Sequence, residues 1–174
     1  MKLRKITQQD LKHLWEIGFT QEDVEWAKWD APYFEEYKVI SFDEFIATYK
    51  NWFQSEQVLG IEVDGHLIGM VSCYWEDERT RWLEIGIIIY QENEWSKGYG
   101  TRALKQWITQ VFATYPQIAR VGLTTWSGNY RMMKAAEKLG MKQEAFIRKV
   151  RYYQGIYYDS VKYGILREEW ETKK

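Results

Sequence analysis

Near the middle of the chain, the sequence reads Trp95-Ser96-Lys97-Gly98-Tyr99-Gly100-Thr101. Before it, residues 82–90 read Trp-Leu-Glu-Ile-Gly-Ile-Ile-Ile-Tyr, and the continuous apolar end of this run is typical of a central strand buried on both faces. After it, residues 101–112 place Leu104, Trp107, Ile108, Val111 and Phe112 on one face of a helix. The three segments therefore predict a strand, a glycine-containing loop and a helix that begins at the loop.

The loop also predicts a binding site for an anion. Glycines at positions 98 and 100 let the backbone approach a ligand closely. The first amides of the following helix have no intrahelical partner, and the helix dipole favours negative charge there, with phosphate as the usual occupant. A glycine turn with nothing bound remains the alternative for a lone Gly-x-Gly.

A second alternative is a dinucleotide site, because residues 98–103 match the pattern Gly-x-Gly-x-x-Ala. That fingerprint needs an acidic residue about 20 positions further on, which would hold the ribose. The next predicted strand, residues 119–125, contains no carboxylate. The loop therefore favours a nucleotide pyrophosphate over NAD.

The remaining segments predict a mixed sheet with helices. Residues 57–63 and 67–75 read as a hairpin that turns at Asp64-Gly65. Thr7 and Asp10 resemble a capping box, in which the Thr7 hydroxyl accepts from early helical amides. Further strands are expected at residues 3–6, 118–124, 141–152 and 156–166, and further helices at residues 42–53 and 129–139. Antiparallel strands followed by alternating strands and helices predict an α+β fold with a mixed, mostly antiparallel sheet.

Composition narrows the class of protein. The chain has 174 residues, which predicts a single domain spanning residues 1–174. A net charge of −1 argues against nucleic acid as the main partner. One cysteine, Cys73, fits a reducing compartment, and with two histidines it leaves little for a zinc site, so no metal is expected. No signal region or membrane-length apolar run is present, so a cytoplasmic protein without membrane contact is expected.

The sequence resembles the GNAT acetyltransferases. Three stretches carry the resemblance: residues 95–104, residues 124–141, which read Thr-Thr-Trp-Ser-Gly-Asn-Tyr-Arg-Met-Met-Lys-Ala-Ala-Glu-Lys-Leu-Gly-Met, and the closing residues 151–159 with 166–170. The last stretch narrows the resemblance to the RimJ/RimL-like branch, named for acetylation of ribosomal protein N-termini. The resemblance covers nearly the whole chain and is most specific from about residue 60 onward.

The resemblance implies a site for acetyl-coenzyme A. Amides of the loop would wrap the pyrophosphate, and the backbone near Ile87, Ile88 and Ile89 would pair with the pantetheine like an added strand, where strands 82–90 and 118–124 splay apart. Asn129 matches the family asparagine that contacts the pantetheine or thiol region, and it also suits a helix N-cap. The implied coenzyme residues are Ile87, Ile88, Ile89, Trp95, Ser96, Lys97, Gly98, Tyr99, Gly100, Thr101 and Asn129. Trp95 departs from the family's usual Gln or Arg.

Glu84 is the candidate catalytic base, since RimL-like sequences commonly carry a glutamate at this point of the strand. The alternative is a surface glutamate paired with Arg81 or another neighbour. Other family positions are missing: Ala136 replaces a general-acid tyrosine, Met132 a serine and Arg151 a glutamate. Tyr130, Tyr152 and Tyr157 are open candidates for a proton donor, and Cys73 reads as a buried strand residue rather than an acyl carrier.

The acceptor is expected to be a primary amine, either a small molecule or a peptide N-terminus. Residues 22–44 contain eight acidic and two basic side chains, and aromatic residues crowd the same region. Trp26, Trp29, Tyr33 and Tyr37 are candidate substrate-binding residues, because aromatic faces with nearby acids attract cations. The alternative is that the aromatics are core and the acids a solvated face. Further alternatives are a non-catalytic acyl-CoA-binding module and a dinucleotide enzyme, and relatives suggest a homodimer.

Overall fold

The computed structural model describes residues 1–172. The chain forms two compact units: unit 1 contains residues 1–72 and 87–104, and unit 2 contains residues 73–86 and the chain from residue 105 onward. Three elements contribute residues to both units, namely the strands β3 (His66–Asp77) and β4 (Trp82–Ile89) and the helix α4 (Tyr99–Thr114). Each unit is described separately below.

The strands follow the order β1-β2-β3-β4-β5-β7-β6 in one sheet, which confirms the predicted α+β class. The remaining strands are β1 (Lys2–Arg4), β2 (Val58–Val63), β5 (Arg120–Trp126), β6 (Lys142–Tyr153) and β7 (Ile156–Leu166). Strands β4 and β5 are parallel, whereas β1–β2, β2–β3, β5–β7 and β6–β7 are antiparallel. The sheet is therefore mixed, as the order of predicted elements indicated.

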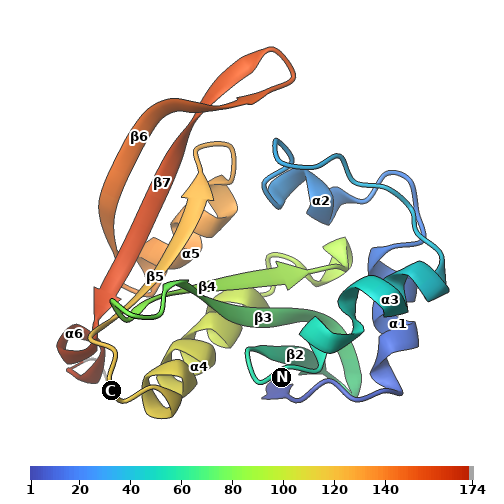
Figure 1. Cartoon of the computed structure of the whole chain (residues 1–174), viewed down its shortest axis with the longest axis horizontal. Helices are drawn as coiled ribbons and strands as arrows, with labels where there is room; N and C mark the ends of the chain where they lie inside the picture. Colours follow the sequence, from blue (N-terminus) through green and yellow to red (C-terminus); the bar gives the residue numbers. More distant parts are fainter. Residues whose placement is uncertain (173–174) are drawn as a thin grey trace. The chain divides into compact units, whose positions relative to one another are not determined.

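Unit 1 packs helices against the β2–β3 hairpin (Figure 1). The hairpin turns at Asp64 and Gly65 with φ of +50° and +88°, as predicted for this dipeptide. Its helices are α1 (Asp10–Gly18), α2 (Glu25–Trp29) and α3 (Phe42–Phe53). Helix α3 begins at a complete capping box, in which Ser41 accepts from the Glu44 amide and the Glu44 carboxylate accepts from the Ser41 amide.

The first helix starts differently from the prediction. The Thr7 hydroxyl donates to Asp10 Oδ2 at 2.7 Å instead of accepting from a helical amide, and the Thr7 amide donates to the same oxygen at 2.8 Å. Arg4 donates two further hydrogen bonds to the Asp10 carboxylate, at 2.7 and 2.8 Å. This cluster holds the pKa of Asp10 well below its usual range, mainly through the Arg4 hydrogen bonds. The carboxylate of Asp10, not the Thr7 hydroxyl, therefore organises the start of α1.

The core of unit 1 is mainly aromatic. Phe19 and Phe45 lie at its centre with ring centroids 5.0 Å apart. Other buried members come from α1, α3, β2, β3 and the residue after β4, and they include Leu11, Leu14, Phe53, Val58, Leu67, Met70 and Tyr90. Many of the aromatic residues between positions 15 and 53 are thus part of the hydrophobic core. The sequence had left open whether they form the core or an acceptor site.

Unit 2 combines the β6–β7 hairpin with β5 and two helices, α5 (Tyr130–Lys138) and α6 (Arg167–Glu171) (Figure 1). Gly140 follows α5 with φ of +73°, as expected for a glycine that ends a helix. Arg167 anchors the end of β7 because its guanidinium donates to the carbonyls of Phe112, Tyr115 and Ile118 at 2.8–3.0 Å.

Three short elements were not predicted: α2, α6 and the 3₁₀ turn η1 (Glu92–Glu94). The burial expected for the end of β4 is also wrong, since Ile87, Ile88 and Ile89 are half-buried and only Tyr90 is buried. Among the helices of residues 1–172, none combines the length and the hydropathy that crossing a bilayer requires.

Candidate active site

Glu84 lies at the centre of a polar cluster in unit 2. Its carboxylate accepts from Thr124 Oγ1 at 2.5 Å and from Tyr74 Oη at 3.3 Å, both at Oε2. At Oε1 it accepts from Trp82 Nε1 at 3.2 Å and faces Lys162 Nζ at 3.6 Å. Lys162 also donates to Thr124 Oγ1 at 2.8 Å. Four donors from β3, β4, β5 and β7 therefore surround one carboxylate.

Strand register explains why these side chains meet. Glu84 of β4 is the register partner of Gly122 on β5, and Thr124 of β5 is the register partner of Lys162 on β7. Because alternate residues of a strand share a face, Trp82 and Glu84 lie on the same face of β4. Glu84 is fully buried, so the surface glutamate considered from the sequence is ruled out, and its cationic partner is Lys162 rather than Arg81.

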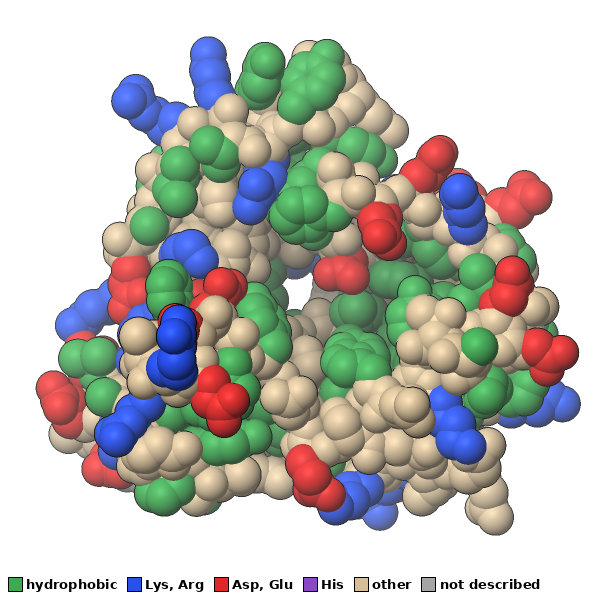
Figure 2. Space-filling view, in the orientation of Figure 1, with side chains coloured by type: hydrophobic (Ala, Val, Ile, Leu, Met, Phe, Trp, Pro, Cys, Tyr) green, Lys and Arg blue, Asp and Glu red, His purple; other side chains and the backbone are tan. Residues whose placement is uncertain are grey.

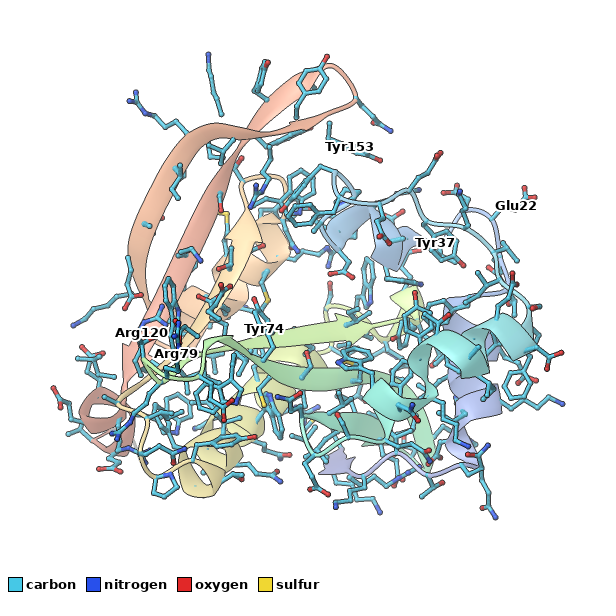
Figure 3. All side chains as sticks on the ribbon, viewed as in Figure 1. Glu22, Tyr37, Tyr74, Arg79, Arg120 and Tyr153 are labelled. Carbon is cyan, nitrogen blue, oxygen red and sulfur yellow. The ribbon has the colours of Figure 1, made fainter. Side chains whose placement is uncertain are left out.

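A pocket of about 410 Å³ in unit 2 borders this cluster. Trp82 and Lys162 line it together with Arg120 and Glu144. The Arg120 guanidinium and the Glu144 carboxylate form an ion pair, with Nε to Oε2 at 2.9 Å. Figure 3 labels Arg120 and Tyr74, the two residues that mark the ion pair and the polar cluster.

Two glycines lie in the sheet beneath this ion pair. Gly122 and Gly164 are register partners on β5 and β7. A Cβ at Gly122 would lie 2.3 Å from Arg120 Nη1, and a Cβ at Gly164 would lie 2.2 Å from Glu144 Oε1. The ends of the two charged side chains thus lie directly over the two glycines, and a Cβ at either glycine would push them aside.

The loop between η1 and α4 has the geometry of an anion-binding turn in unit 1. Ser96 and Gly98 both have positive φ, +62° and +80°. The first intrahelical hydrogen bond of α4 runs from the Arg102 amide to the Gly98 carbonyl, so the amides of Tyr99, Gly100 and Thr101 precede it. A Cβ at Gly100 would meet only Ile89 and Ile87 side chains, at 3.7 and 3.9 Å. Positive-φ residues before a helix start form a concave row of amides that suits a phosphate.

Trp95 fastens the start of this loop to β4. Its indole Nε1 donates to the Ile89 carbonyl at 2.9 Å, and its ring lies 6.4 Å from that of Trp29. Lys97 pairs with Glu94 at 3.1 Å and leaves half of its side chain exposed. Trp95, which departs from the family pattern, thus links the loop to β4 within unit 1.

Strand β4 approaches β3 very closely at its end. The Tyr90 amide donates to the Ile68 carbonyl at 2.9 Å. A Cβ at Gly69 would lie 2.1 Å from the Ile88 carbonyl oxygen and 2.8 Å from Ile89 Cα. Gly69 is therefore needed for the backbone of Ile88 and Ile89 to take this position, and these are two of the residues implied to pair with pantetheine.

Asn129 is the N-cap of α5 in unit 2. Its Oδ1 accepts from the Met132 amide at 3.0 Å, which confirms the capping role that the sequence allowed. Ala136, at the position of the missing general-acid tyrosine, is fully buried. Cys73 is buried, and burial raises the pKa of its thiol to about 11, so it is no nucleophile at neutral pH.

The four candidate acceptor residues lie in different surroundings within unit 1. Trp26 and Tyr37 pack at right angles with centroids 5.5 Å apart, and both donate to the Gly18 carbonyl. Trp29 donates to Glu25 at 3.2 Å and lies against Trp95, whereas Tyr33 packs on Phe34. Trp26 and Tyr37 thus border the core, so structural packing accounts for half of this set.

Acidic side chains do reach the aromatic cluster. Burial raises the pKa of Tyr49, and the negative charges of Glu35 and Asp30 raise it further. In Figure 2, red acidic side chains lie over the helices of unit 1. Glu22, which is labelled in Figure 3, is exposed. The region around Tyr49 therefore combines aromatic faces with negative potential.

Comparison with protein families identifies the fold. The family model described as "Acetyltransferase (GNAT) domain" matches residues 1–142. The chain belongs to the GNAT acetyltransferase family. The strand–loop–helix unit around Gly98 and Gly100 is thus a GNAT element, and the resemblance to the GNAT acetyltransferases is confirmed.

Among curated relatives of this GNAT chain, Bacillus subtilis (strain 168) YdaF, which carries the provisional name ribosomal N-acetyltransferase, is 35% identical over 115 residues. The match covers 66% of this chain and 62% of YdaF, so the chain aligns with less than two thirds of that relative. A crystal structure described as a probable acetyltransferase has a TM-score of 0.74 at 26% identity and covers 97% of this chain and 93% of its own.

A solved structure of similar fold has bound ligands. Spermidine N-acetyltransferase from Vibrio cholerae, in complex with CoA and spermine, gives a TM-score of 0.77 at 20% identity over 98% of this chain and 97% of its own. At this identity the likeness establishes the fold alone.

Proposed function

We propose that this GNAT chain is an acetyl-CoA-dependent N-acetyltransferase of the RimJ/RimL-like branch that transfers an acetyl group to a primary amine. The amide row at the start of α4 carries the proposal, because a positive-φ glycine followed by three amides suits a pyrophosphate. Family membership and relatives named as N-acetyltransferases support the same activity.

The coenzyme would be held by three groups of residues. Amides of the loop, from Trp95, Ser96 and Lys97 through Thr101, would bind the pyrophosphate. The backbone of Ile87, Ile88 and Ile89 would pair with pantetheine, and the half-buried isoleucine side chains would supply an apolar surface. Asn129, whose side-chain oxygen caps α5, would contact the thiol end. When bound, acetyl-CoA supplies an activated thioester.

Glu84 would serve as the base for the acceptor. Acetyl transfer needs a neutral amine next to the thioester carbonyl, and most primary amines are protonated at neutral pH. The Glu84 carboxylate is held in one place by Thr124, Tyr74 and Trp82, which suits a positioned proton acceptor. Lys162 Nζ lies 3.6 Å from Oε1 and provides a cation beside the carboxylate.

The acceptor would be cationic. The aromatic and acidic surface that Tyr49 shares with Glu35 and Asp30 supports a polyamine or a basic peptide N-terminus. Trp26, Trp29, Tyr33 and Tyr37 are proposed to shape this surface, with Trp26 and Tyr37 acting from the core side. If so, reversing charge in Glu35→Lys/Glu36→Lys raises the acceptor KM severalfold, and an unchanged KM moves the acceptor site elsewhere.

The first experiment is a thermal shift with acetyl-CoA, with NADH as control. A ligand at about 100 times its Kd stabilises a protein by about 2.7 kcal/mol. A shift with acetyl-CoA alone supports the coenzyme site and leads to a panel of spermidine, spermine and short basic peptides, scored by free thiol release. Absence of a shift with acetyl-CoA would contradict the proposed coenzyme site.

A second candidate function is a non-catalytic acyl-CoA-binding module. Ala136 and Met132 replace side chains that family members use in catalysis, and this observation favours it. The same two measurements separate the functions, because the module gives the thermal shift without thiol release. A cytoplasmic location and a homodimer remain predictions from the sequence.

A further inference from the structure

Glu84 is too deeply buried to touch an acceptor. Its side chain is 0% exposed, so an amine arriving from solvent meets the groups around the carboxylate before the carboxylate itself. If Glu84 is the base, a proton must reach it through a neighbour that contacts both Glu84 and solvent. The identity of that neighbour follows from the four contacts of the carboxylate.

Three of these contacts are poor proton carriers. The Trp82 indole N–H is a donor only and keeps its proton. Lys162 is an ammonium that donates to Thr124 and has no lone pair for an incoming proton. The Thr124 hydroxyl already donates to Glu84 and accepts from Lys162, so it lies between two partners. Each of the three therefore holds the carboxylate in place.

Tyr74 is the remaining contact, and its hydroxyl lies 3.3 Å from Glu84 Oε2. Unlike the indole and the ammonium, a hydroxyl can accept a proton as well as donate one, and Tyr74 is more exposed than Thr124, the other hydroxyl of the cluster. The residue is 41% exposed, although its carboxylate partner is fully buried. In Figure 3 the labelled Tyr74 belongs to the part of β3 that lies within unit 2.

We propose that Tyr74 relays the proton of the acceptor amine to the buried Glu84 carboxylate. The inference rests on the proposed acetyltransferase function and deepens it by adding a catalytic group that touches the acceptor. The N–H bond of the ammonium breaks and a new O–H bond forms on Tyr74, while the original Tyr74 proton passes to Glu84 Oε2. The freed lone pair then forms the C–N bond as the C–S bond breaks.

Two further proton transfers complete the reaction. After attack, the second excess N–H proton goes to the thiolate that leaves, giving the free thiol and a neutral amide. The proton on Glu84 returns to solvent through Tyr74. Burial raises the pKa of Tyr74, and the charges of Glu84 and Glu76 raise it further, so the hydroxyl stays protonated and ready to donate at neutral pH.

The test measures kcat and KM against pH for three variants, using whichever of spermidine, spermine or a basic peptide turns over fastest. Tyr74→Phe removes one oxygen, Glu84→Gln removes the base, and the third variant combines both. Tyr153→Phe is the matched control, because its hydroxyl accepts from the Gln154 side chain on the β6–β7 hairpin. Circular dichroism verifies that every variant folds.

The relay predicts that Tyr74→Phe lowers kcat by about 30-fold or more, within the range of positioned proton transfer. The KM for acetyl-CoA stays within twofold, and kcat/KM rises with pH until the acceptor's own pKa, because the amine must now arrive neutral. The double variant is no slower than the slower single variant, since both residues serve one step.

Other outcomes overturn the relay in distinguishable ways. If Glu84→Gln is slow and Tyr74→Phe stays within threefold of wild type, Tyr74 has no part in proton transfer, although Glu84 remains the base. If both variants match wild type, the base role of Glu84 falls with the relay while acetyl transfer stands. If the wild type releases no thiol with any acceptor, the proposed function itself fails, and this is seen before any variant is measured.

Discussion

At the scale of single residues, the proposed catalysis rests mainly on the Glu84 cluster. A buried carboxylate with one cation and three neutral donors is costly to disturb, because removing a partner leaves a buried charge less well compensated. Such a cluster contributes to stability as well as to the proposed catalysis, so a test must separate the two.

The first prediction concerns Glu84→Gln. The amide keeps the shape of the side chain but cannot take a proton, so kcat/KM for the acceptor falls by about 100-fold or more. Steady-state thiol release measures it. Glu78→Gln, at an exposed carboxylate in the turn between β3 and β4, is the control and stays near wild type. A loss of less than threefold in Glu84→Gln would retire the base role.

At the scale of secondary-structure elements, the second prediction concerns the turn that leads into α4. In Gly100→Ala the new Cβ has ordinary contacts with Ile87 and Ile89, and alanine favours a helix by up to about 1 kcal/mol over glycine. The melting temperature therefore stays the same or rises. The methyl group would, however, separate the amide row from a pyrophosphate, so the thermal shift with acetyl-CoA shrinks.

Gly98→Ala provides the contrast, since its φ of +80° makes alanine strained in the folded chain. This variant loses stability even without coenzyme. If Gly100→Ala keeps the full acetyl-CoA shift, the pyrophosphate does not approach the backbone at this glycine.

The start of α1 supplies a pH-dependent prediction. The folded-state pKa of Asp10 is lowered by Arg4, so its stabilising effect is present above the unfolded value of about 3.8 and is lost as pH falls through the folded value. Asp10→Asn keeps a capping oxygen but loses the charge. Urea unfolding should therefore show a stability difference from wild type at pH 7 that narrows between pH 4 and pH 2.5.

The exposed Glu22→Gln serves as the control for this comparison and should follow wild type across the same range. A difference for Asp10→Asn that stays constant with pH would mean that the ion pair with Arg4 contributes little.

Local patterns predicted most elements because their cues are short. The Asp64-Gly65 turn and the period of α4 each lie within a few neighbouring residues. Helix α2 has five residues, too few for a helical period to be visible, and α6 follows β7 without a loop. Patterning therefore fails where a helix is too short to complete two turns.

The polar cluster was predictable only in part, for a different reason. Glu84 stood out as a carboxylate in an apolar strand, but Tyr74, Thr124 and Lys162 reach it from three other strands. Their meeting depends on the registers Glu84↔Gly122 and Thr124↔Lys162, which no local pattern encodes. The half-exposure of Ile87–Ile89 was missed because an apolar run looks the same whether protein or a ligand covers it.

At the scale of the whole molecule, the last prediction follows from the elements that contribute residues to both units. Because β3, β4 and α4 each contribute to both units, unfolding one unit breaks elements of the other. We expect residues 1–174 to behave as a single domain, with one urea transition that coincides by circular dichroism and tryptophan fluorescence. Two separated transitions would contradict this, and repeating the measurement with acetyl-CoA would show which unit binds it.

The ion pair between Arg120 and Glu144 lies over Gly122 and Gly164, and this arrangement limits how the sequence can evolve. A methyl group at either glycine would push aside the end of the Arg120 or Glu144 side chain, so a substitution there disturbs the ion pair. Shortening Arg120 and Glu144 first would open the way for a larger residue below. The four positions should therefore tend to change together, and descendants of this chain that lose one of these glycines should more often lose the ion pair as well.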